Sequence, residues 1–351
     1  MAESPTWMTY CHLVFPVIEI TQVGEARRQA ARLAETVGLD EATAGKVSIV
    51  VAELATNLVR YGKKGEILLR PLSDAVGLGL EVLAIDHAPG IENTGRCLED
   101  GYSTGGTAGN GLGAVKRLSA EFDLYGSLAS AKQPGGTVVF SRVRAGRSTK
   151  KSAFEWGVIE RPAPHEVACG DTWRIAERDQ QLAILMADGL GHGPQAAESA
   201  DTAAEVFAAD PFAVPTEMMT IADRRLRGMR GASLTITQIN SRDNKLTHVG
   251  VGNIAGHLRS RTGSYRKGLM SHNGTVGAEM RKVQQIDYDY PEHPLLILHS
   301  DGIQTRWLLE NYPGLINRHP AVIAAVLARD FTRGRDDVTV VVIRSSAPTS
   351  T

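Results

Sequence analysis

The sequence predicts an α+β protein of two domains. The chain has 351 residues, which is more than a single hydrophobic core usually organises. A basic stretch without apolar periodicity, "RAGRSTKKSAF", occupies 144–154 and is typical of a linker. Segments of helical spacing and segments of strand-like alternation occur on both sides of it. We therefore expect one domain over 10–143, a linker over 144–154 and a second domain over 155–345.

The composition limits the classes of function. A net charge of −1 disfavours a broad surface for nucleic acid or anionic membranes, which requires a basic excess. The three cysteines, Cys11, Cys97 and Cys169, are widely spaced, so neither a disulfide framework nor a thiolate zinc motif is indicated. We see neither a signal peptide nor an apolar run of the roughly 20 residues that span a bilayer. We expect a cytoplasmic protein with no nucleic-acid or membrane partner.

The first domain shows two helices followed by strands. Apolar residues at helical spacing predict a helix over 23–38, and Asp40 is a plausible cap for a longer helix over 39–62. Strands are predicted over 65–72, 78–86, 121–127 and 136–143. This order indicates an α/β sandwich, with the helices on one face of a mixed or antiparallel sheet.

The second domain is richer in strands. They are predicted over 155–162, 181–188, 232–240, 245–252, 254–260, 295–301 and 338–344, with helices near 193–209, 215–229 and 320–330. Two antiparallel sheets flanked by helices is the natural packing for this count. Periodicity does not determine the strand order.

Two polar residues lie on the apolar helix of the first domain. Glu53 and Asn57 are four residues apart and share a helix face. A magnesium–phosphate site would explain them, because Mg²⁺ prefers oxygen ligands and an amide adds no negative charge near a triphosphate. An exposed polar strip would explain them equally well.

Two Gly-containing loops favour the nucleotide interpretation. Asp86 ends a predicted strand before a turn at Gly90, where a carboxylate can accept a hydrogen bond from an adenine amino group. "GNGLG" at 109–113 leads into a helix predicted to begin at about Leu112, and the N–H groups of a helix start bind phosphate. Neither the G-x-G-x-x-G nor the G-x-x-x-x-G-K-[ST] pattern occurs, which disfavours the two common nucleotide folds.

In this order, residues 10–143 resemble the GHKL ATPases of the Bergerat fold, specifically the anti-sigma-factor serine kinases and the RsbT-type switch kinase. The resemblance implies that Asn57 holds Mg²⁺, that Asp86 reads adenine and that Glu53 acts as the base or orients the attacking hydroxyl. It assigns the ATP-binding boxes to Asp86 and Gly90, to Gly109, Gly111 and Gly113, and to Thr137. Ala88 departs from a common second glycine, and 92–108 would form a short ATP lid.

Aspartates recur at strand boundaries in the second domain. They are Asp171 in "ACGDTW", Asp188 in "LMADGLGHG", Asp301 in "LILHSDG", and Asp336 and Asp337 in "GRDDVT". Hard oxygen ligands without a His/Cys cluster indicate Mg²⁺ or Mn²⁺ rather than zinc, and two such ions could clamp a phosphate for in-line attack by water. Asp-Gly pairs are also good turns, which would explain two of these positions without any metal.

The aspartate set resembles the PPM-class serine/threonine phosphatases, closest to the RsbX/SpoIIE branch, over about 155–343. The resemblance implies an α-β-β-α sandwich in which Asp188 is catalytic and bridges two metal ions, Mn²⁺ or Mg²⁺, and the Gly189 carbonyl binds one of them. Asp171, Asp301 and Asp336 would complete the site, with Asp336 preferred to Asp337. His192 could be a proton donor, or it could cap a helix or pack in its loop. Asn253 looks like a turn residue.

Together these resemblances imply a bifunctional bacterial signalling regulator. An ATP- and Mg²⁺-dependent serine/threonine kinase-like domain would be fused to a metal-dependent phosphatase of phosphoserine and phosphothreonine. The expected substrates are STAS-domain antagonist proteins in a partner-switching pathway, such as a stressosome or a sigma-factor regulator. Tethering would raise the concentration of each domain near a shared partner. In the alternative hypothesis the first domain only senses ATP and binds partners, and so regulates the phosphatase.

Overall fold

A computed structural model describes residues 11–346 except 75, 92–110, 147–151 and 264. The chain divides into two compact units. The N-terminal unit comprises His12–Lys151 and, from much later in the sequence, Leu308–Asp330. The C-terminal unit comprises Met1–Cys11, Ser152–Trp307 and Phe331–Thr351. The two compact units are defined by packing and include segments from distant parts of the chain. The predicted limits 10–143, 144–154 and 155–345 therefore remain predictions.

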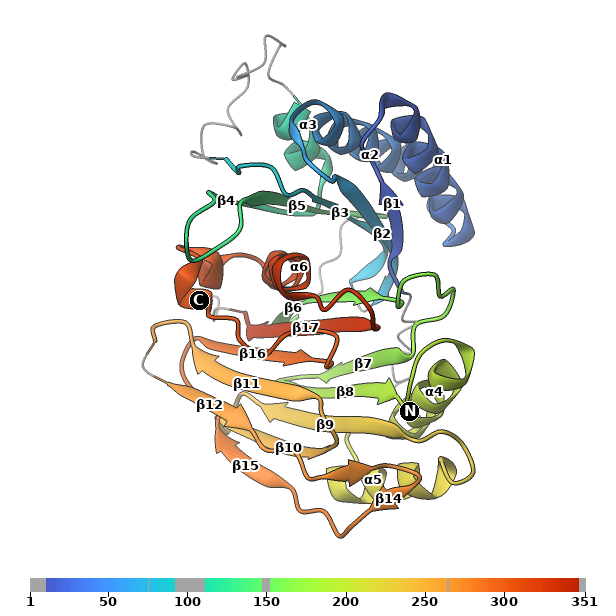
Figure 1. Ribbon diagram of the computed structural model, residues 1–351, viewed down its shortest axis with the longest axis vertical. Helices are drawn as coiled ribbons and strands as arrows, with labels where there is room; N and C mark the ends of the chain where they lie inside the picture. Colours follow the sequence, from blue (N-terminus) through green and yellow to red (C-terminus); the bar gives the residue numbers. More distant parts are fainter. Residues whose placement is uncertain (1–10, 75, 92–110, 147–151, 264, 347–351) are drawn as a thin grey trace. The chain divides into compact units, whose positions relative to one another are not determined.

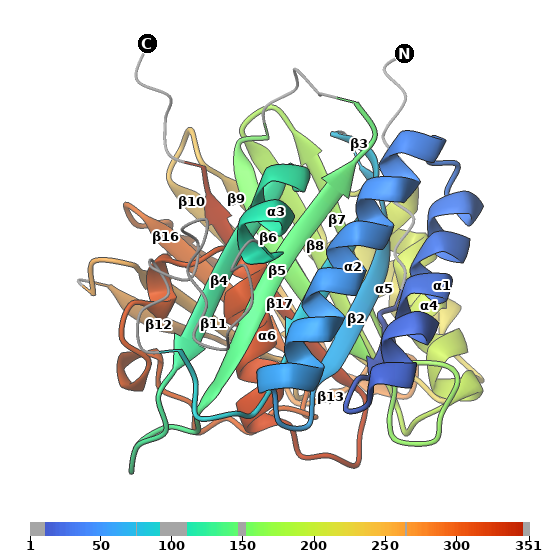
Figure 2. The ribbon, with the colours of Figure 1, turned by 90° about the horizontal axis from the view of Figure 1, so that it is seen from above.

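The N-terminal unit contains a five-stranded antiparallel sheet with three helices of the described residues on one face. The strand order is β1-β2-β3-β5-β4. The strands are β1 Leu13–Pro16, β2 Glu66–Asp74, β3 Gly77–Ile85, β4 Glu121–Ser127 and β5 Gly136–Arg144. The helices are α1 Ile20–Thr36, α2 Glu41–Tyr61 and α3 Gly111–Leu118, which lie side by side across the sheet (Figure 2). Helices on one face of an antiparallel sheet is the arrangement that the sequence predicts.

Helix α2 is the centre of this unit. Its side-chain cap is the predicted one, because Asp40 accepts a hydrogen bond from the Thr43 N–H at 2.8 Å. Buried residues of α2 join residues of α1 and the sheet in one apolar cluster that includes Val47, Val50 and Leu54. By length and composition alone α2 would suffice to cross a membrane, although we saw no such run in the sequence. The structure uses its apolar face as a core surface instead.

The other face of this sheet carries helix α6, Pro320–Phe331 (Figure 1). The segment that leads into α6 contains two short 3-10 helices, η2 Leu309–Asn311 and η3 Leu315–Asn317. The His319 ring stacks on Phe140 of β5 with 4.2 Å between ring centroids. Asp123 of β4 accepts hydrogen bonds from the His319 N–H at 2.6 Å and from Arg318 at 3.2 Å. The sequence predicts this helix but not the sheet on which it lies.

The C-terminal unit contains two stacked antiparallel sheets. One has the order β15-β10-β9-β8-β7 and the other the order β12-β11-β16-β17-β6. The first is formed by β7 Asp171–Arg178, β8 Gln181–Gly189, β9 Ala232–Asn240, β10 Lys245–Val251 and β15 Ile286–Asp289. The second is formed by β6 Phe154–Arg161, β11 Ala255–Ser260, β12 Arg266–Leu269, β16 Pro294–His299 and β17 Val338–Ser345. A small hairpin pairs β13 Gly274–Thr275 with β14 Glu279–Met280.

Two apolar clusters hold the C-terminal unit together. Side chains from both sheets, such as Met186, Leu296 and Val341, form the cluster between them. Helices α4 Pro194–Ala209 and α5 Pro215–Arg225 cover the outer face of the first sheet through a second cluster that includes Phe207 and Met219. All seven predicted long strands are present. Strand β7 and the short strands β12 to β15 were not predicted, because their apolar alternation is short or interrupted by charge.

Candidate functional sites

The N-terminal unit brings Glu53 and Asn57 of α2 beside the start of α3. A Cβ built on Gly111, the first residue of α3, would lie 2.7 Å from Glu53 Oε2 and 3.9 Å from Asn57 Nδ2. Both side chains of α2 are therefore beside the Gly-rich helix start, and both are partly exposed. A side chain at position 111 would fill this space, so glycine leaves room next to the carboxylate and the amide.

Asp86 lies immediately after β3 and is buried. Its carboxylate accepts the Ala88 N–H at 2.7 Å, and its own N–H donates to the Thr137 carbonyl at 3.0 Å. Burial raises the pKa of Asp86, while the hydrogen bond from Ala88 and the charge of Arg329 oppose that shift. Gly90 has a φ of +95°, and a Cβ there would lie 2.0 Å from the Ser127 carbonyl oxygen. The turn after Asp86 therefore requires glycine at position 90.

Arg329 of α6 lies at the same edge of the sheet. Its Nη2 donates to Ser127 Oγ at 3.1 Å, and its Nε donates to Asp330 at 2.7 Å. A Cβ built on Gly136 would lie 2.4 Å from Arg329 Nη1 and 2.3 Å from the Asp86 carbonyl oxygen. No motif in the sequence connected this arginine with the nucleotide boxes, because it lies about 190 to 240 residues further along the chain. Gly109 and the predicted lid, 92–108, lie outside the described residues, and Gly113 is buried within α3.

The C-terminal unit brings the aspartates of its two sheets together. Asp171 and Asp188 are direct cross-strand partners at the ends of β7 and β8. The next residue, Gly189, donates its N–H to the Gly170 carbonyl at 2.9 Å. A Cβ on Gly189 would lie 2.0 Å from the Ala196 carbonyl oxygen, so the strand end passes directly against α4. Backbone pairing thus fixes the positions of these two carboxylates.

Asp301 and the pair Asp336–Asp337 come from the second sheet. Asp301 follows β16, and Asp337 directly precedes β17. A Cβ on Gly302 would lie 1.9 Å from the Asp337 carbonyl oxygen, which places the two strand ends in contact. A Cβ on Gly170 would lie 2.6 Å from Asp337 Oδ2, which places that carboxylate beside the start of β7.

Electrostatics show that the aspartates form one group. Burial, followed by the charges of Asp301, Asp336 and Asp337, raises the pKa of Asp188 to about 8. Burial, followed by the Asp188 charge, also raises the pKa of Asp171 well above its usual range. Burial, followed by the charge of Asp336, raises the pKa of Asp301. Carboxylates that repel one another are poised to accept a cation.

The residues present fit divalent metal ions. Within the described part of the chain, Asp171 Oδ2 and Asp337 Oδ2 are buried without a hydrogen-bond partner. Buried polar atoms without a partner are costly, and a hard cation would satisfy both of these. The side chains concerned supply oxygen only, which suits Mg²⁺ or Mn²⁺.

Asn253 and Ser233 also belong to this neighbourhood, and Asp337 has one more hydrogen bond there. Asn253 Nδ2 donates to Asp301 Oδ2 at 2.7 Å, and Ser233 Oγ donates to Asn253 Oδ1 at 2.7 Å. Asn253 is therefore more than the turn residue that its sequence context suggests, because it orients a site carboxylate. Asp337 lies in the group beside Asp336. It accepts the Ala163 N–H at 2.8 Å through its other oxygen.

His192 is exposed and forms an ion-pair contact with Glu166 at 2.7 Å through Nδ1. The N-cap of α4 is Gly193, without a side-chain cap. These contacts agree with loop packing rather than helix capping, and Glu166 holds the His192 ring.

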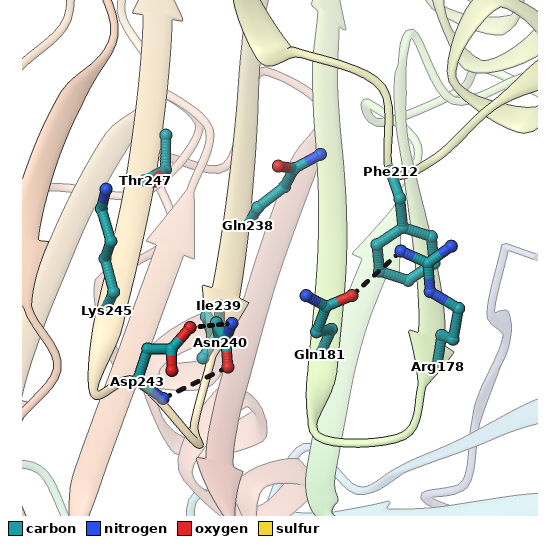
Figure 3. A pocket seen from close by; sticks show the side chains of 9 residues that line it. All are labelled: Arg178, Gln181, Phe212, Gln238, Ile239, Asn240, Asp243, Lys245 and Thr247. Atoms are coloured by element: carbon teal, nitrogen blue, oxygen red, sulfur yellow. Dashed lines mark hydrogen bonds between the residues drawn. The ribbon is translucent and has the colours of Figure 1, made fainter.

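A groove of about 310 Å³ occurs at the opposite ends of the same strands (Figure 3). Gln181 and Asn240 line it, and they are the residues of β8 and β9 furthest from Asp188 and Ser233. The Arg178 guanidinium lies over the Phe212 ring at 4.3 Å. No predicted catalytic residue lines this groove, so we do not assign it to the site.

Comparison with known proteins supports the division between the two sites. A family model described as a histidine kinase-like ATPase domain matches residues 18–141. A model described as stage II sporulation protein E (SpoIIE) matches residues 178–346, which include Asp188, Asp301 and Asp336 but begin after Asp171.

Two curated relatives match different halves. The chain is 36% identical to the serine/threonine-protein kinase RsbT of Bacillus subtilis (strain 168) over 99 residues, 28% of this chain and 74% of that protein. It is 26% identical to the phosphoserine phosphatase RsbX of the same strain over 135 residues, 38% of this chain and 67% of that protein. A solved structure described under the bacterial stressosome is 27% identical, with a TM-score of 0.50. It covers 56% of this chain and 100% of that one.

These matches define a protein that joins a histidine kinase-like ATPase domain to a SpoIIE-type serine/threonine phosphatase domain. Through its N-terminal domain the chain belongs to the family of the serine/threonine-protein kinase RsbT. The pairing is that of a partner-switching regulator, which confirms the class of function expected from the sequence.

Proposed function

We propose that the two domains carry opposite reactions on STAS-domain proteins of a cytoplasmic partner-switching pathway. The N-terminal domain would transfer the γ-phosphoryl group of ATP to a serine or threonine hydroxyl. The C-terminal domain would hydrolyse the resulting phosphoester to the hydroxyl and inorganic phosphate. The observation that carries the phosphatase assignment is the meeting of buried aspartates from two sheets, with two buried oxygens left without partners.

In the phosphatase site, we assign the metal-binding role to Asp171, Asp188, the Gly189 carbonyl, Asp301 and Asp336, with Asp337 as a further candidate. Two bound Mn²⁺ or Mg²⁺ ions would supply Lewis-acid stabilisation of the phosphate and activation of water. The chain's own contribution is rigidity. Strand pairing holds Asp171 against Asp188, and Asn253 orients Asp301.

In the kinase-like site, we assign to Glu53 the role of accepting the proton of the attacking hydroxyl or of orienting that hydroxyl, and to Asn57 the role of holding Mg²⁺. The support is their common location beside Gly111 at the start of α3. The N–H groups of that helix start would face the phosphates. Asp86, buried at the end of β3, would accept the adenine amino group, with Thr137 and Gly90 shaping the same edge.

The phosphatase assignment is tested with a phosphoserine STAS-domain protein. Asp188→Ala should reduce Mn²⁺-dependent phosphate release by about 100-fold or more, because it removes a carboxylate from the centre of the group. Asp289→Asn, on an exposed edge of the same domain, is the matched control and should retain full activity. Equal activity of Asp188→Ala and the wild-type chain would show that the site is elsewhere.

The kinase assignment is tested in the Asp188→Ala background, which prevents removal of the label. Radiolabelled ATP is incubated with a STAS-domain protein. Label should appear on that protein, and Glu53→Gln should abolish transfer while ATP binding persists. Glu41→Gln, an exposed acid on the same helix, is the control. If ATP binds and no label is transferred, the domain is a nucleotide sensor, as in the alternative hypothesis.

A further inference from the structure

A second, chemically different cluster of side chains that could bind a metal occurs in the C-terminal unit. One ligand atom each from Cys11, Glu160 and Cys169 lie within 4.8 Å of one another. Glu160 is near the end of β6, and Cys169 precedes β7 by two residues. Cys11 comes from the start of the described chain, and contact places it in this unit. The three side chains are therefore brought together only by folding.

Each of the three side chains also has a hydrogen-bond partner on β6 or β7. Cys11 Sγ lies 3.4 Å from the Glu160 carbonyl oxygen, and Cys169 Sγ lies 3.4 Å from the Arg161 carbonyl oxygen. The two thiols thus lie beside the carbonyls of two consecutive residues at the end of β6. The Glu160 carboxylate is buried and accepts the Trp173 Nε1–H at 3.0 Å. A hydrogen-bond donor such as the Trp173 indole fixes the direction of a metal-binding carboxylate.

The ligand types distinguish this cluster from the aspartate group. Two sulfurs and one oxygen favour a thiophilic cation such as Zn²⁺, whereas oxygen ligands alone favour Mg²⁺ or Mn²⁺. Around tetrahedral zinc, with Zn–S near 2.3 Å, ligand sulfurs are about 3.8 Å apart. Atoms within 4.8 Å therefore need to approach by about 1 Å at most. A disulfide would use both sulfurs and would not involve the carboxylate.

We propose that Cys11, Glu160 and Cys169 bind one zinc ion, with solvent in the fourth position. The site ties residue 11 to the end of β6 and to the loop that begins β7. Because Asp171 is the first residue of β7, the ion would hold the position of that strand end. This proposal does not depend on the phosphatase assignment, and its test does not use catalysis.

The test is a titration of the reduced full-length chain with Co²⁺, which reports thiolate ligands through a near-ultraviolet charge-transfer band. One equivalent of Co²⁺ should produce the band, and Zn²⁺ should displace it. Cys11→Ser and Cys169→Ser should each lose it. Cys97→Ser is the matched control and should keep it, as should Asp188→Ala, because the aspartate group contains no sulfur.

Glu160→Gln keeps both sulfurs and should retain the band while weakening Zn²⁺ binding about 10-fold or more. Circular dichroism of each variant shows that it is folded before the metal is added. A folded, reduced wild-type chain that gives no thiolate band would overturn the proposal. So would a band that survives in Cys11→Ser, or air oxidation that only joins Cys11 to Cys169 in a chain that never binds Zn²⁺.

Discussion

The glycine after Asp188 shows what a single residue contributes to the candidate site. Read as sequence, "DGLGHG" is either a metal site or a turn that needs positive φ. In the structure Gly191 and Gly193 have φ values of +89° and +77° and supply the turn. Gly189 does not share that conformation. It continues strand β8 and allows the strand end to pass against the backbone of α4.

Gly189→Ala should therefore destabilise the C-terminal unit through overpacking, because its Cβ would lie 2.0 Å from a backbone oxygen that cannot rotate away. We expect a loss of about 1–3 kcal/mol in the free energy of unfolding, measured by denaturant titration. Gly268→Ala, where a Cβ meets nothing within 4 Å, is the matched control and should be neutral. Equal stability of the two variants would contradict this account of the glycine.

Asn253→Ala removes the donor that orients Asp301. We expect Mn²⁺ affinity to fall by about 10- to 100-fold, since loss of such an orienting partner has that typical cost. The measurement is the Mn²⁺ dependence of phosphate release, in which the midpoint should move to higher concentration. Asn240→Ala is the control, because Asn240 lies at the end of β9 that is remote from Ser233 and Asp188. An unchanged midpoint would show that Asp301 needs no support from Asn253.

At the scale of elements, β3 carries a buried acid that has no part in either proposed reaction. Glu81 is fully buried, and its carboxylate receives Arg70 at 2.6 Å, Arg142 at 2.8 Å and His12 at 3.2 Å. Burial alone would raise the pKa of Glu81, but the two guanidinium groups hold it well below its usual range. The network therefore joins β3 to its neighbours β2 and β5.

Glu81→Gln leaves two buried cations without their counter-charge and should cost about 3–5 kcal/mol in the free energy of unfolding at neutral pH. The sign of the pH dependence follows from the lowered pKa. The stabilisation is complete above the ordinary value of 4.5 and is lost as pH falls below it. The difference between wild type and variant should shrink in acid. Glu35→Gln, at an exposed position of α1, is the control, and a pH-independent difference would contradict the prediction.

Helix α6 carries Arg329, which lies at the edge of the sheet beside Gly136 and Asp86. Arg329→Met should lower ATP affinity several-fold, because Ser127 and Asp330 lose their partner next to Gly136 and Asp86. Isothermal titration with Mg-ATP measures the effect. Arg318→Met removes an arginine from the segment that leads into α6 and should leave the affinity unchanged. If both variants bind ATP like the wild type, α6 covers the sheet without acting on the nucleotide site.

For the whole molecule, two separate sites predict two separate responses to ligand. A ligand at 100 times its Kd adds about 2.7 kcal/mol to the unit that binds it. In calorimetry, Mg-ATP should raise one unfolding transition and Mn²⁺ another. Asn57→Ala should remove only the first shift and Asp188→Ala only the second. Loss of both shifts in either single variant would contradict the assignment of one ligand to each unit.

The sequence by itself determined the two-domain α+β class, the cap at Asp40 and seven of the long strands of the second half, though not β7, because these depend on local periodicity and local hydrogen bonds. It also gave the candidate residues, since Asp at strand ends and Gly before a helix are local patterns. Tertiary structure decided what those patterns contact. The pairing of Asp171 with Asp188, the support of Asp301 by Asn253, and the grouping of α6 with the N-terminal sheet all join residues distant in sequence. Such contacts depend on strand order and packing, which periodicity does not encode.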